Sequence, residues 1–262
     1  MELSLQGKNA LVGGASAGIG RAVAQELALL GANVILLART ESALQSAVAA
    51  LPAVAGQTHR YCVADYSDTA ALRTQVEALL QDVGAIHILV NNTGGPPGGP
   101  IAAAESAAFL QAYNNHLLCN HLLAQLLLPG MQAAAYGRII NIISTSVKEP
   151  LDGLGVSNTT RWAVAAWAKT LANEVGRFGV TVNNVLPGYT ETARLQEIIA
   201  KRAAGAGQSE AEIAESFKQH VPLRRFARPE EVAAAAAFLA SPAAAYINGI
   251  NLPVDGGRTK SL

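Results

Sequence analysis

The stretch Gly13-Gly14-Ala15-Ser16-Ala17-Gly18-Ile19-Gly20 decides the fold, because it joins a short apolar run, Asn9 to Val12, to a segment with helical periodicity. The helical spacing of apolar residues continues from Ile19 to Leu30, and Gly31 is a usual C-cap residue. Glycines in a tight strand-to-helix turn let backbone N–H groups approach a pyrophosphate, and the helix N-terminus adds a positive dipole end. The stretch therefore predicts a dinucleotide-binding turn near the start of an α/β protein.

The alternation of strand and helix continues along the chain. The next apolar run, Val34 to Leu37, has no apolar–polar alternation, so both of its faces are expected to be covered, as in a parallel sheet between helical layers. Further strands are predicted at residues 60–64, 86–90, 138–143, 180–186 and 250–254, and helices at 41–50, 68–83, 105–134, 157–177 and after Pro229. The pattern predicts a Rossmann-type, doubly wound parallel sheet of about seven strands flanked by helices.

The bulk composition narrows the classes of partner. The chain has 262 residues, 50% of them hydrophobic, and its 19 Lys and Arg balance its 19 Asp and Glu. A neutral chain lacks the positive electrostatic field that attracts nucleic acids and acidic membrane surfaces. No apolar run approaches the ~20 residues of a membrane span. The N-terminus has no basic stretch followed by an apolar one, so a cytoplasmic location is expected. We therefore expect a small-molecule substrate, with no nucleic acid and no membrane as partners.

Neither a linker nor an internal repeat divides the chain, so residues 1–262 are expected to form one domain. Cys62 and Cys119 are expected as buried apolar side chains, and without clustered Cys and His no metal site is expected. The Gly/Pro-rich run from Thr93 to Pro100 and the long segment 189–222 interrupt the alternation at the carboxyl edge of the sheet, where ligands bind in such folds. Segment 189–222 is expected to be a substrate lid, the alternative being a plain surface excursion.

The end of the second strand, Leu37-Ala38-Arg39-Thr40, bears on the choice of cofactor. An acidic residue there would accept a hydrogen bond from the adenine ribose 2′-OH and favour NAD. This chain has Ala38 instead, and the guanidinium of Arg39 can clamp a 2′-phosphate by paired hydrogen bonds. NADP(H) is therefore expected to be preferred over NAD(H), unless Arg39 is merely a solvated loop cation.

The glycine spacing resembles the TGxxxGxG turn of the short-chain dehydrogenase/reductase family, with Gly13 in place of the usual Thr. Further motifs resemble that family in the right order: Ala64-Asp65, Asn91-Asn92-Thr93-Gly94, Asn183 to Gly188, Thr192, Asn248-Gly249 and Asp255-Gly256-Gly257. The overall pattern is similar to the 3-oxoacyl-(acyl-carrier-protein) reductase group, and the Gly/Pro loop to a divergent branch of it with an altered active site. The resemblance implies cofactor contacts from Gly14, Ser16, Gly18, Ile19, Gly20, Arg39, Asp65, Asn91, Asn92, Gly94, Arg161, Pro187, Gly188 and Thr192. It also implies a homo-oligomer, tetramer or dimer, with helices 105–134 and 157–177 at one interface.

The residues that carry the family's chemistry are largely replaced. The family uses a Ser, a Tyr, a Lys one helical turn later and an Asn on another helix. The strand that begins at Gly137 resembles the one that ends at the catalytic Ser, here Ser144. Counting back from the motif that starts at Ala168 places Ser157 and Arg161 at the Tyr and Lys positions, and the helix before Leu128 places His116 at the Asn position.

These replacements change the expected chemistry. A serine hydroxyl is a far weaker acid than a phenol, and an arginine stays charged, so neither Ser157 nor Arg161 can take over the usual proton transfer. Arg161 can still bind ribose hydroxyls and stabilise a developing alkoxide. His116 is a candidate acid or base, because imidazole titrates near pH ~6.5, with a plain core or subunit contact as the alternative. Tyr189 could supply a phenol or pack under the lid.

Two main functional hypotheses follow. The first is an NADP(H)-dependent oxidoreductase acting on a carbonyl/alcohol pair, similar to 3-oxoacyl reductases, with Ser144, Ser157, Arg161 and His116 as catalytic residues. The second is an NADP(H)-binding sensor or regulatory protein without turnover on the same fold. Lyase or isomerase chemistry on this scaffold is a third possibility, and the fold alone does not choose among them.

Overall fold

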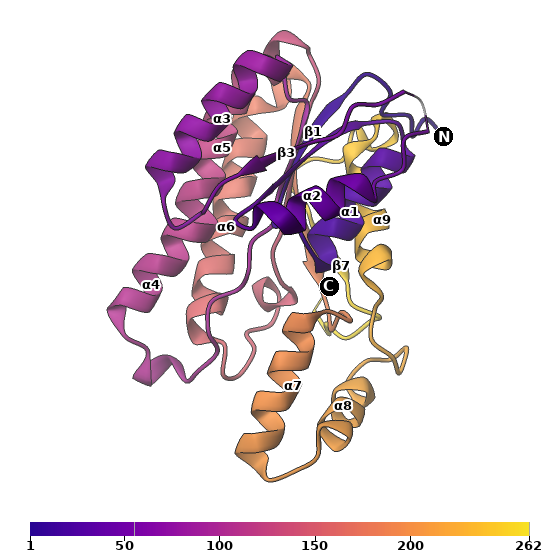
Figure 1. The fold of residues 1–262 in the computed structure, drawn as a ribbon. Coiled ribbons are helices and arrows are strands. Elements are labelled where there is room, and N and C mark those ends of the chain that lie inside the picture. The colour runs from indigo at the N-terminus through magenta and orange to yellow at the C-terminus, as the bar shows by residue number, and fades with distance from the viewer. Residues whose placement is uncertain (55, 262) are drawn as a thin grey trace.

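The computed structural model describes residues 1–54 and 56–261, and within them seven parallel strands form one sheet in the order β3-β2-β1-β4-β5-β6-β7 (Figure 1). The strands are β1 (Asn9–Gly13), β2 (Asn33–Ala38), β3 (Arg60–Val63), β4 (Ile88–Asn91), β5 (Gly137–Ile142), β6 (Val180–Pro187) and β7 (Asn251–Val254). The strand order reverses between β1 and β4, which creates the crevice where α/β sheets bind ligands. The predicted doubly wound α/β fold is confirmed.

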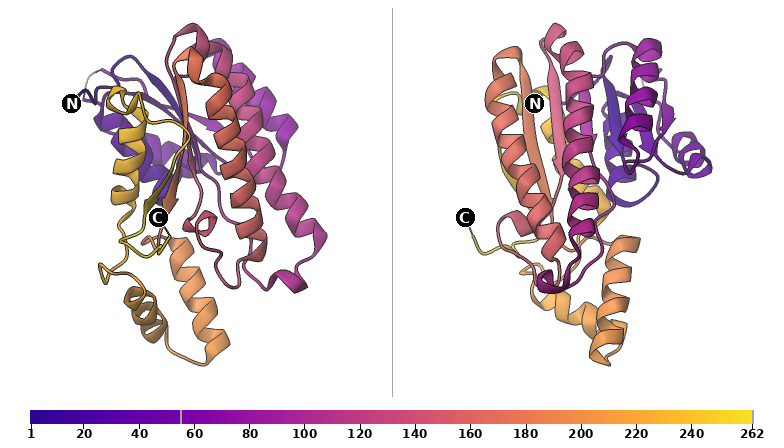
Figure 2. Two further views of the ribbon diagram at one scale, coloured as in Figure 1. Left: turned by 180° about the vertical axis from the view of Figure 1, so that it is seen from behind. Right: turned by 90° about the vertical axis from the view of Figure 1, so that its left-hand side faces the viewer.

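Helices cover both faces of the sheet (Figure 2). The core on one face includes α1 (Gly18–Leu29), α2 (Glu41–Ala49) and α9 (Pro229–Ala240), and that on the other includes α3 (Thr69–Val83), α5 (Cys119–Ala133) and α6 (Gly155–Val175). Strands β1, β2, β4 and β5 contribute alternate residues to the two cores, which explains their unbroken apolar runs. No helix within residues 1–54 and 56–261 is both long and apolar enough to cross a membrane.

One segment differs from the sequence-based expectation in detail. The single helix expected over 105–134 is divided into α4 (Ser106–Tyr113), a π-helical turn (Asn114–Leu118) and α5. Such a turn inserts a residue into the helical ladder and is frequent at functional sites, but apolar periodicity does not reveal it. The segment expected to form a lid contains α7 (Ala193–Ala206) and α8 (Glu210–Gln219), which project beyond the carboxyl edge of the sheet (Figure 1). Short 3-10 turns occupy Ile101–Ala103, Thr145–Val147, Gly176–Phe178 and Pro242–Ala244.

A row of asparagine side chains crosses four strands within the sheet. Asn91 Nδ2 donates to Asn141 Oδ1, Asn141 Nδ2 to Asn184 Oδ1, and Asn184 Nδ2 to Asn251 Oδ1, each at 2.8 Å. The same residues are Cα partners in the strand register. Because Asn141 and Asn184 each donate and accept, this asparagine ladder satisfies polar groups that would be costly to bury unpaired, whereas Asn91 Oδ1 at its β4 end has no hydrogen-bond partner among the described residues. It also fixes the register of β4 to β7 and hence the position of the loops that follow them.

Candidate active site

The glycine turn after β1 is a close-packed cradle. Gly14 and Gly18 have φ of 56° and 55°, a backbone region that favours glycine. A Cβ on Gly14 would lie 2.7 Å from the carbonyl oxygen of Asn92, and one on Gly20 would collide with the Gly14 carbonyl. Asn92 Nδ2 donates to the carbonyl oxygen of Gly13 at 3.1 Å and so fixes the turn to the end of β4. The turn opens directly into the N-terminus of α1, the arrangement that binds pyrophosphates.

A cavity of about 440 Å³, here termed the inner cavity, lies at the carboxyl ends of the strands. It joins residues from the β1–α1 turn, the loop after β4, the end of β5, helix α6 and the segment after β6. The sequence-predicted residues that line it are Gly14, Gly18, Ile19, Asn92, Gly94, Ser144, Ser157, Arg161, Pro187, Gly188 and Thr192. Residues more than 170 positions apart in the chain thus share one site, as the family resemblance implied.

Two other predicted cofactor residues face each other at the ends of neighbouring strands. Arg39 follows β2 and Asp65 follows β3, and Arg39 Nη1 lies 3.9 Å from Asp65 Oδ2, with both side chains largely solvent-exposed. A hydrogen bond from the Ser67 backbone N–H lowers the pKa of Asp65, and the charge of Arg39 lowers it further. Arg39 therefore has only a long, solvent-screened contact with its carboxylate neighbour.

Ser16, Gly20 and Asn91 lie around the inner cavity rather than among the residues that line it. Ser16 and Gly20 belong to the glycine turn and the start of α1. The side chain of Asn91 is buried and donates to Asn141, so it is engaged in the asparagine ladder directly below the Asn92–Gly94 loop. Its neighbour Asn92 is the one that reaches the turn.

Arg161 is a buried cation on the wall of the inner cavity. It is 8% exposed, and its Nη1 donates to the Ile142 carbonyl oxygen at 3.2 Å, while its Nη2 faces Gly95. No carboxylate of residues 1–54 and 56–261 forms an ion pair with it. Burial lowers the pKa of Arg161 to about 10, so the side chain is still protonated at neutral pH. A buried charge without a partner destabilises a fold by several kcal/mol, on the order of 3 to 5.

The two serines lie on different elements of the same cavity. Ser144 follows β5, and its Oγ accepts a hydrogen bond from the Ser146 N–H at 3.0 Å, which leaves the hydroxyl proton free to donate. Ser157 lies in the first turn of α6, one turn before Arg161, so both side chains project from the same helix face into the cavity.

His116 lies on the π-helical turn and is 2% exposed. Its Nδ1 pairs with Thr93 Oγ1, in the loop after β4, at 2.5 Å. Burial, and secondarily the charge of Arg161, lowers the pKa of His116 to about 2. The imidazole is therefore neutral at ordinary pH, whereas the sequence-based hypothesis relied on a histidine that titrates near neutrality.

We expect this burial to make stability depend on pH. The pKa of His116 falls from 6.5 in the unfolded chain to about 2 in the fold, so the unfolded chain binds the proton more readily. Stability is then fully present above pH ~6.5 and is lost as pH falls toward the folded value, at up to about 1.4 kcal/mol per pH unit. Between neutrality and pH ~5, the free energy of unfolding measured in urea is expected to fall by about 2 kcal/mol less in His116→Asn than in the wild type.

The exposed residue His220 provides the control for this experiment. His220→Asn should lose as much stability on acidification as the wild type, because that side chain lies at the surface. Equal acid sensitivity of the wild type and His116→Asn would contradict the proposed burial of a neutral imidazole.

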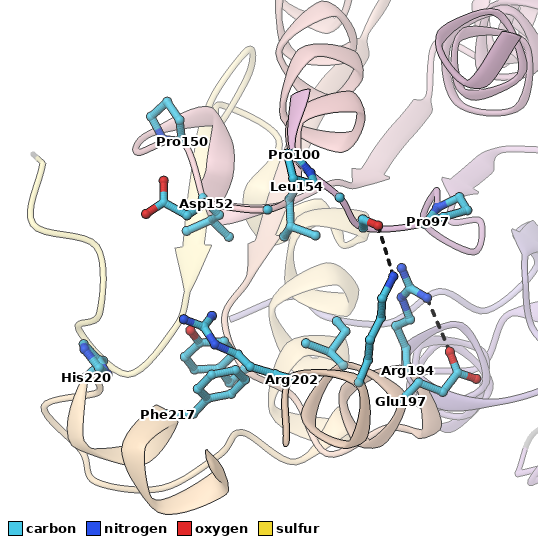
Figure 3. Close-up of a pocket in the computed structure, with 18 of the residues that line it drawn as sticks. Pro97, Pro100, Pro150, Asp152, Leu154, Arg194, Glu197, Arg202, Phe217 and His220 are labelled. Atoms are coloured by element: carbon cyan, nitrogen blue, oxygen red, sulfur yellow. Dashed lines mark hydrogen bonds and ion pairs between the residues drawn. The ribbon is translucent and has the colours of Figure 1, made fainter. Parts of the chain in front are cut away.

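A larger cavity of about 880 Å³, here termed the outer cavity, lies between the Gly95–Pro100 loop, the 149–154 loop and helices α7 and α8 (Figure 3). Two side chains of α7 bridge to the Gly/Pro loop. Arg194 Nη2 donates to the Pro96 carbonyl oxygen at 2.8 Å, and Lys201 Nζ to that of Gly98 at 3.3 Å. The lid helices and the loop thus form two walls of one cavity, which shares lining residues such as Tyr189 and Leu154 with the inner cavity.

Sequence reasoning missed several side chains of this region, among them Arg194, Lys201 and Arg258. Arg258 lines both cavities, and it directly follows the Asp255-Gly256-Gly257 motif that was recognised. A cation next to a turn at the carboxyl edge of the sheet was the available signal. Tyr189, considered as a phenol donor, stacks on Phe217 with ring centroids 4.6 Å apart, which is the alternative of aromatic packing under the lid.

Comparisons with known proteins agree with this architecture. Residues 14–259 match the family model described as enoyl-(acyl carrier protein) reductase. The chain is 36% identical to the 3-oxoacyl-[acyl-carrier-protein] reductase of Pseudomonas aeruginosa over 97% of this chain and 98% of that protein. The crystal structure of L-sorbose reductase from Gluconobacter frateurii, complexed with NADPH and L-sorbose, superposes with a TM-score of 0.93 at 32% identity and covers both chains fully. An actinorhodin polyketide ketoreductase variant with NADPH gives a TM-score of 0.90 at 30% identity and 97% coverage of each chain.

The chain therefore belongs to the short-chain dehydrogenase/reductase family. Its solved neighbours include NADPH-bound members, and the relatives named above are a 3-oxoacyl-[acyl-carrier-protein] reductase, an L-sorbose reductase and a polyketide ketoreductase.

Proposed function

We propose that the protein is an NADP(H)-dependent oxidoreductase that interconverts a carbonyl compound and its alcohol, using a Ser157–Arg161 pair where its family has Tyr and Lys. The observation that carries the proposal is Arg161, a buried guanidinium without an ion-pair partner among the described residues, which lines the same cavity as the dinucleotide-binding turn. A fold keeps such a destabilising charge where function needs it.

The cofactor fits the residues present. The glycine cradle has no room for a Cβ at Gly14 or Gly20, and the backbone there can approach a pyrophosphate closely. Gly94, Gly188 and Thr192 also line the inner cavity, and Thr192 lies against Gly18 of the glycine turn. Arg39 supports NADP(H) over NAD(H), because its weak contact with Asp65 leaves its N–H donors available for a 2′-phosphate.

The cofactor, when bound, supplies or accepts the hydride at the carbon of the carbonyl/alcohol pair. Ser144 and Ser157 would donate hydrogen bonds to the carbonyl oxygen, and the charge of Arg161 would stabilise the negative charge that develops there. The oxygen would take its proton from water, with the Ser157 hydroxyl as a hydrogen-bond partner, since neither Ser157 nor Arg161 is acidic enough to supply the proton. His116 would act as a neutral imidazole that holds Thr93 and the loop facing the cofactor.

The test of the cofactor is a fluorescence titration with NADPH and NADH. We expect micromolar binding of NADPH and a Kd for NADPH raised about 10- to 100-fold in Arg39→Gln, equivalent to roughly 1.4 to 2.7 kcal/mol, with NADH binding unchanged. Arg60→Gln is the matched control, because Arg60 is a surface cation of β3 paired with Asp82. Equal affinity for both cofactors in the wild type would remove the preference, and binding of neither would refute the proposed activity.

Because Tyr and Lys are replaced, a second candidate function is an NADP(H)-binding sensor or regulator without turnover. The two functions differ in one measurement, the oxidation of NADPH in the presence of pyruvate, acetoacetate, levulinate and their methyl esters. Consumption of NADPH with any of them at a rate that depends on Arg161 supports the oxidoreductase. Tight NADPH binding without consumption supports the sensor.

The proposal also covers the domain organisation, the oligomeric state and the cellular location of the protein. Residues 1–262 would act as a single cofactor-binding domain with 189–222 as its substrate lid. A homo-oligomer, tetramer or dimer, is supported by the exposed apolar side chains of Leu110, Leu118 and Trp162 on the α4–α6 surface. The free, buried thiols of Cys62 and Cys119 are consistent with the proposed cytoplasmic location.

A further inference from the structure

Arg258 lies where the inner and outer cavities meet. Its guanidinium lies over the ring of Tyr189, 4.7 Å from the ring centroid, and its Nη1 donates to Thr145 Oγ1 at 3.4 Å. Thr145 directly follows Ser144, so the charge of Arg258 lies next to the residue proposed to hold the carbonyl oxygen. Both cavities include Arg258 among their lining residues.

Among the described residues, this cation has no counter-charge at ion-pair distance. Its Nε is buried without a hydrogen-bond partner, so the side chain has already given up part of its hydration. Of the carboxylates that line the outer cavity, Glu197 pairs with Arg194 and Glu149 accepts hydrogen bonds from the backbone of the C-terminal segment.

The third carboxylate of the outer cavity, that of Asp152, lies on the 149–154 loop with Pro150 and Leu154, on the wall opposite Phe217 (Figure 3). No ion pair joins Asp152 to Arg258 among the described residues. The junction of the two cavities keeps a net positive charge that a ligand can meet.

Aromatic stacking holds Arg258 in place. Tyr189 stacks in turn on Phe217, with an interplanar angle of 9°, so the platform beneath the guanidinium is rigid. A cation–π contact uses the face of the guanidinium and leaves its N–H edge free. A planar edge of two N–H donors matches the two oxygens of a carboxylate.

We propose that Arg258 binds a carboxylate of the substrate, so that the substrate is an oxo acid rather than a neutral ketone. This inference rests on the proposed function, because Ser144 marks the position of the carbonyl only if the protein reduces one. The contact of Arg258 with Thr145 places the two groups of the substrate close together, and the outer cavity has room for the remainder of the molecule.

The test uses matched acids and esters on the NADP⁺-loaded protein, measured by calorimetry. The probes are pyruvate, acetoacetate and levulinate, which increase the spacing of carboxylate and carbonyl stepwise, each with its methyl ester. At least one acid is expected to bind on the order of 10-fold more tightly than its ester. Arg258→Gln is expected to abolish that difference, and Arg258→Lys to retain part of it, while NADPH binds both variants as it binds the wild type.

Arg202→Gln is the matched control, because Arg202 also lies over an aromatic ring, that of Phe217, but lines only the outer cavity. It should retain the preference for the acid. The inference is overturned if every ester binds as tightly as its acid, if Arg202→Gln has the same effect as Arg258→Gln, or if inorganic phosphate binds more tightly than the acids. A wild type that fails to bind NADPH in the separate titration refutes the proposed function instead.

Discussion

Replacing Arg161 by Met is expected to lower kcat for NADPH oxidation by about 100- to 1,000-fold, the usual effect of removing one preorganised group that stabilises an oxyanion. Arg161 has no ion-pair partner among the described residues, so its charge is free to act on a bound substrate. Steady-state kinetics with whichever oxo acid or ester supports turnover provide the measurement. Because kcat is measured at saturating NADPH, a reduced affinity for the cofactor in the variant does not lower it, and a fall in kcat reports a slower catalytic step.

The same substitution removes an uncompensated buried charge, so the free energy of unfolding should stay the same or rise. A loss of activity in a protein that is no less stable cannot be ascribed to misfolding. Arg161→Lys is the matched control, since it keeps the charge on a shorter side chain and should retain part of kcat. Wild-type kcat in Arg161→Met would exclude Arg161 from the reaction.

Replacing Asn141 by Leu is expected to reduce the free energy of unfolding by about 2 to 5 kcal/mol. The substitution breaks the asparagine ladder in its middle and leaves Asn91 Nδ2 and Asn184 Oδ1 unpaired inside the sheet. Each buried polar group without a partner costs about 1 to 3 kcal/mol. Urea unfolding followed by circular dichroism measures the loss as a shift of the midpoint.

Asn251→Leu is the control at the exposed end of the ladder. Its loss leaves one buried polar atom, Asn184 Nδ2, without a partner instead of two, so the expected cost is smaller, about 1 to 3 kcal/mol. Equal destabilisation by the two substitutions would show that the row of amides does not act as a connected network.

The sequence predicted the architecture well because strand and helix periodicities are local properties. The unbroken apolar run at Val34 to Leu37 required helices on both faces, and the structure has them. The glycine turn was equally predictable, since only a tight strand-to-helix connection explains glycines at Gly14, Gly18 and Gly20. The order of the motifs likewise indicated that residues following four different strands would lie together, and these residues line one cavity.

The electrostatic character of the site could not be predicted in the same way. His116 was expected to titrate near neutrality, but its pKa depends on burial and on Arg161, which lies 45 residues later in the chain. The hydrogen bond of the Asn91 side chain to a strand partner 50 residues away was likewise not predicted, and the contact of Asn91 with the cofactor stays a prediction. Arg258 was missed because its contacts with Tyr189 and Thr145 join three distant segments. Such properties arise from the tertiary structure.

The two hydrogen bonds from α7 to the Gly/Pro loop bear on attempts to redesign this protein. Arg194 and Lys201 donate to backbone carbonyl oxygens, and the loop that supplies those carbonyls lies about a hundred residues earlier in the chain. A lid grafted from a relative that lacks an arginine and a lysine at these two positions would lose both bonds to the loop. Loop 93–100 and segment 189–222 should therefore be exchanged together, as one cassette.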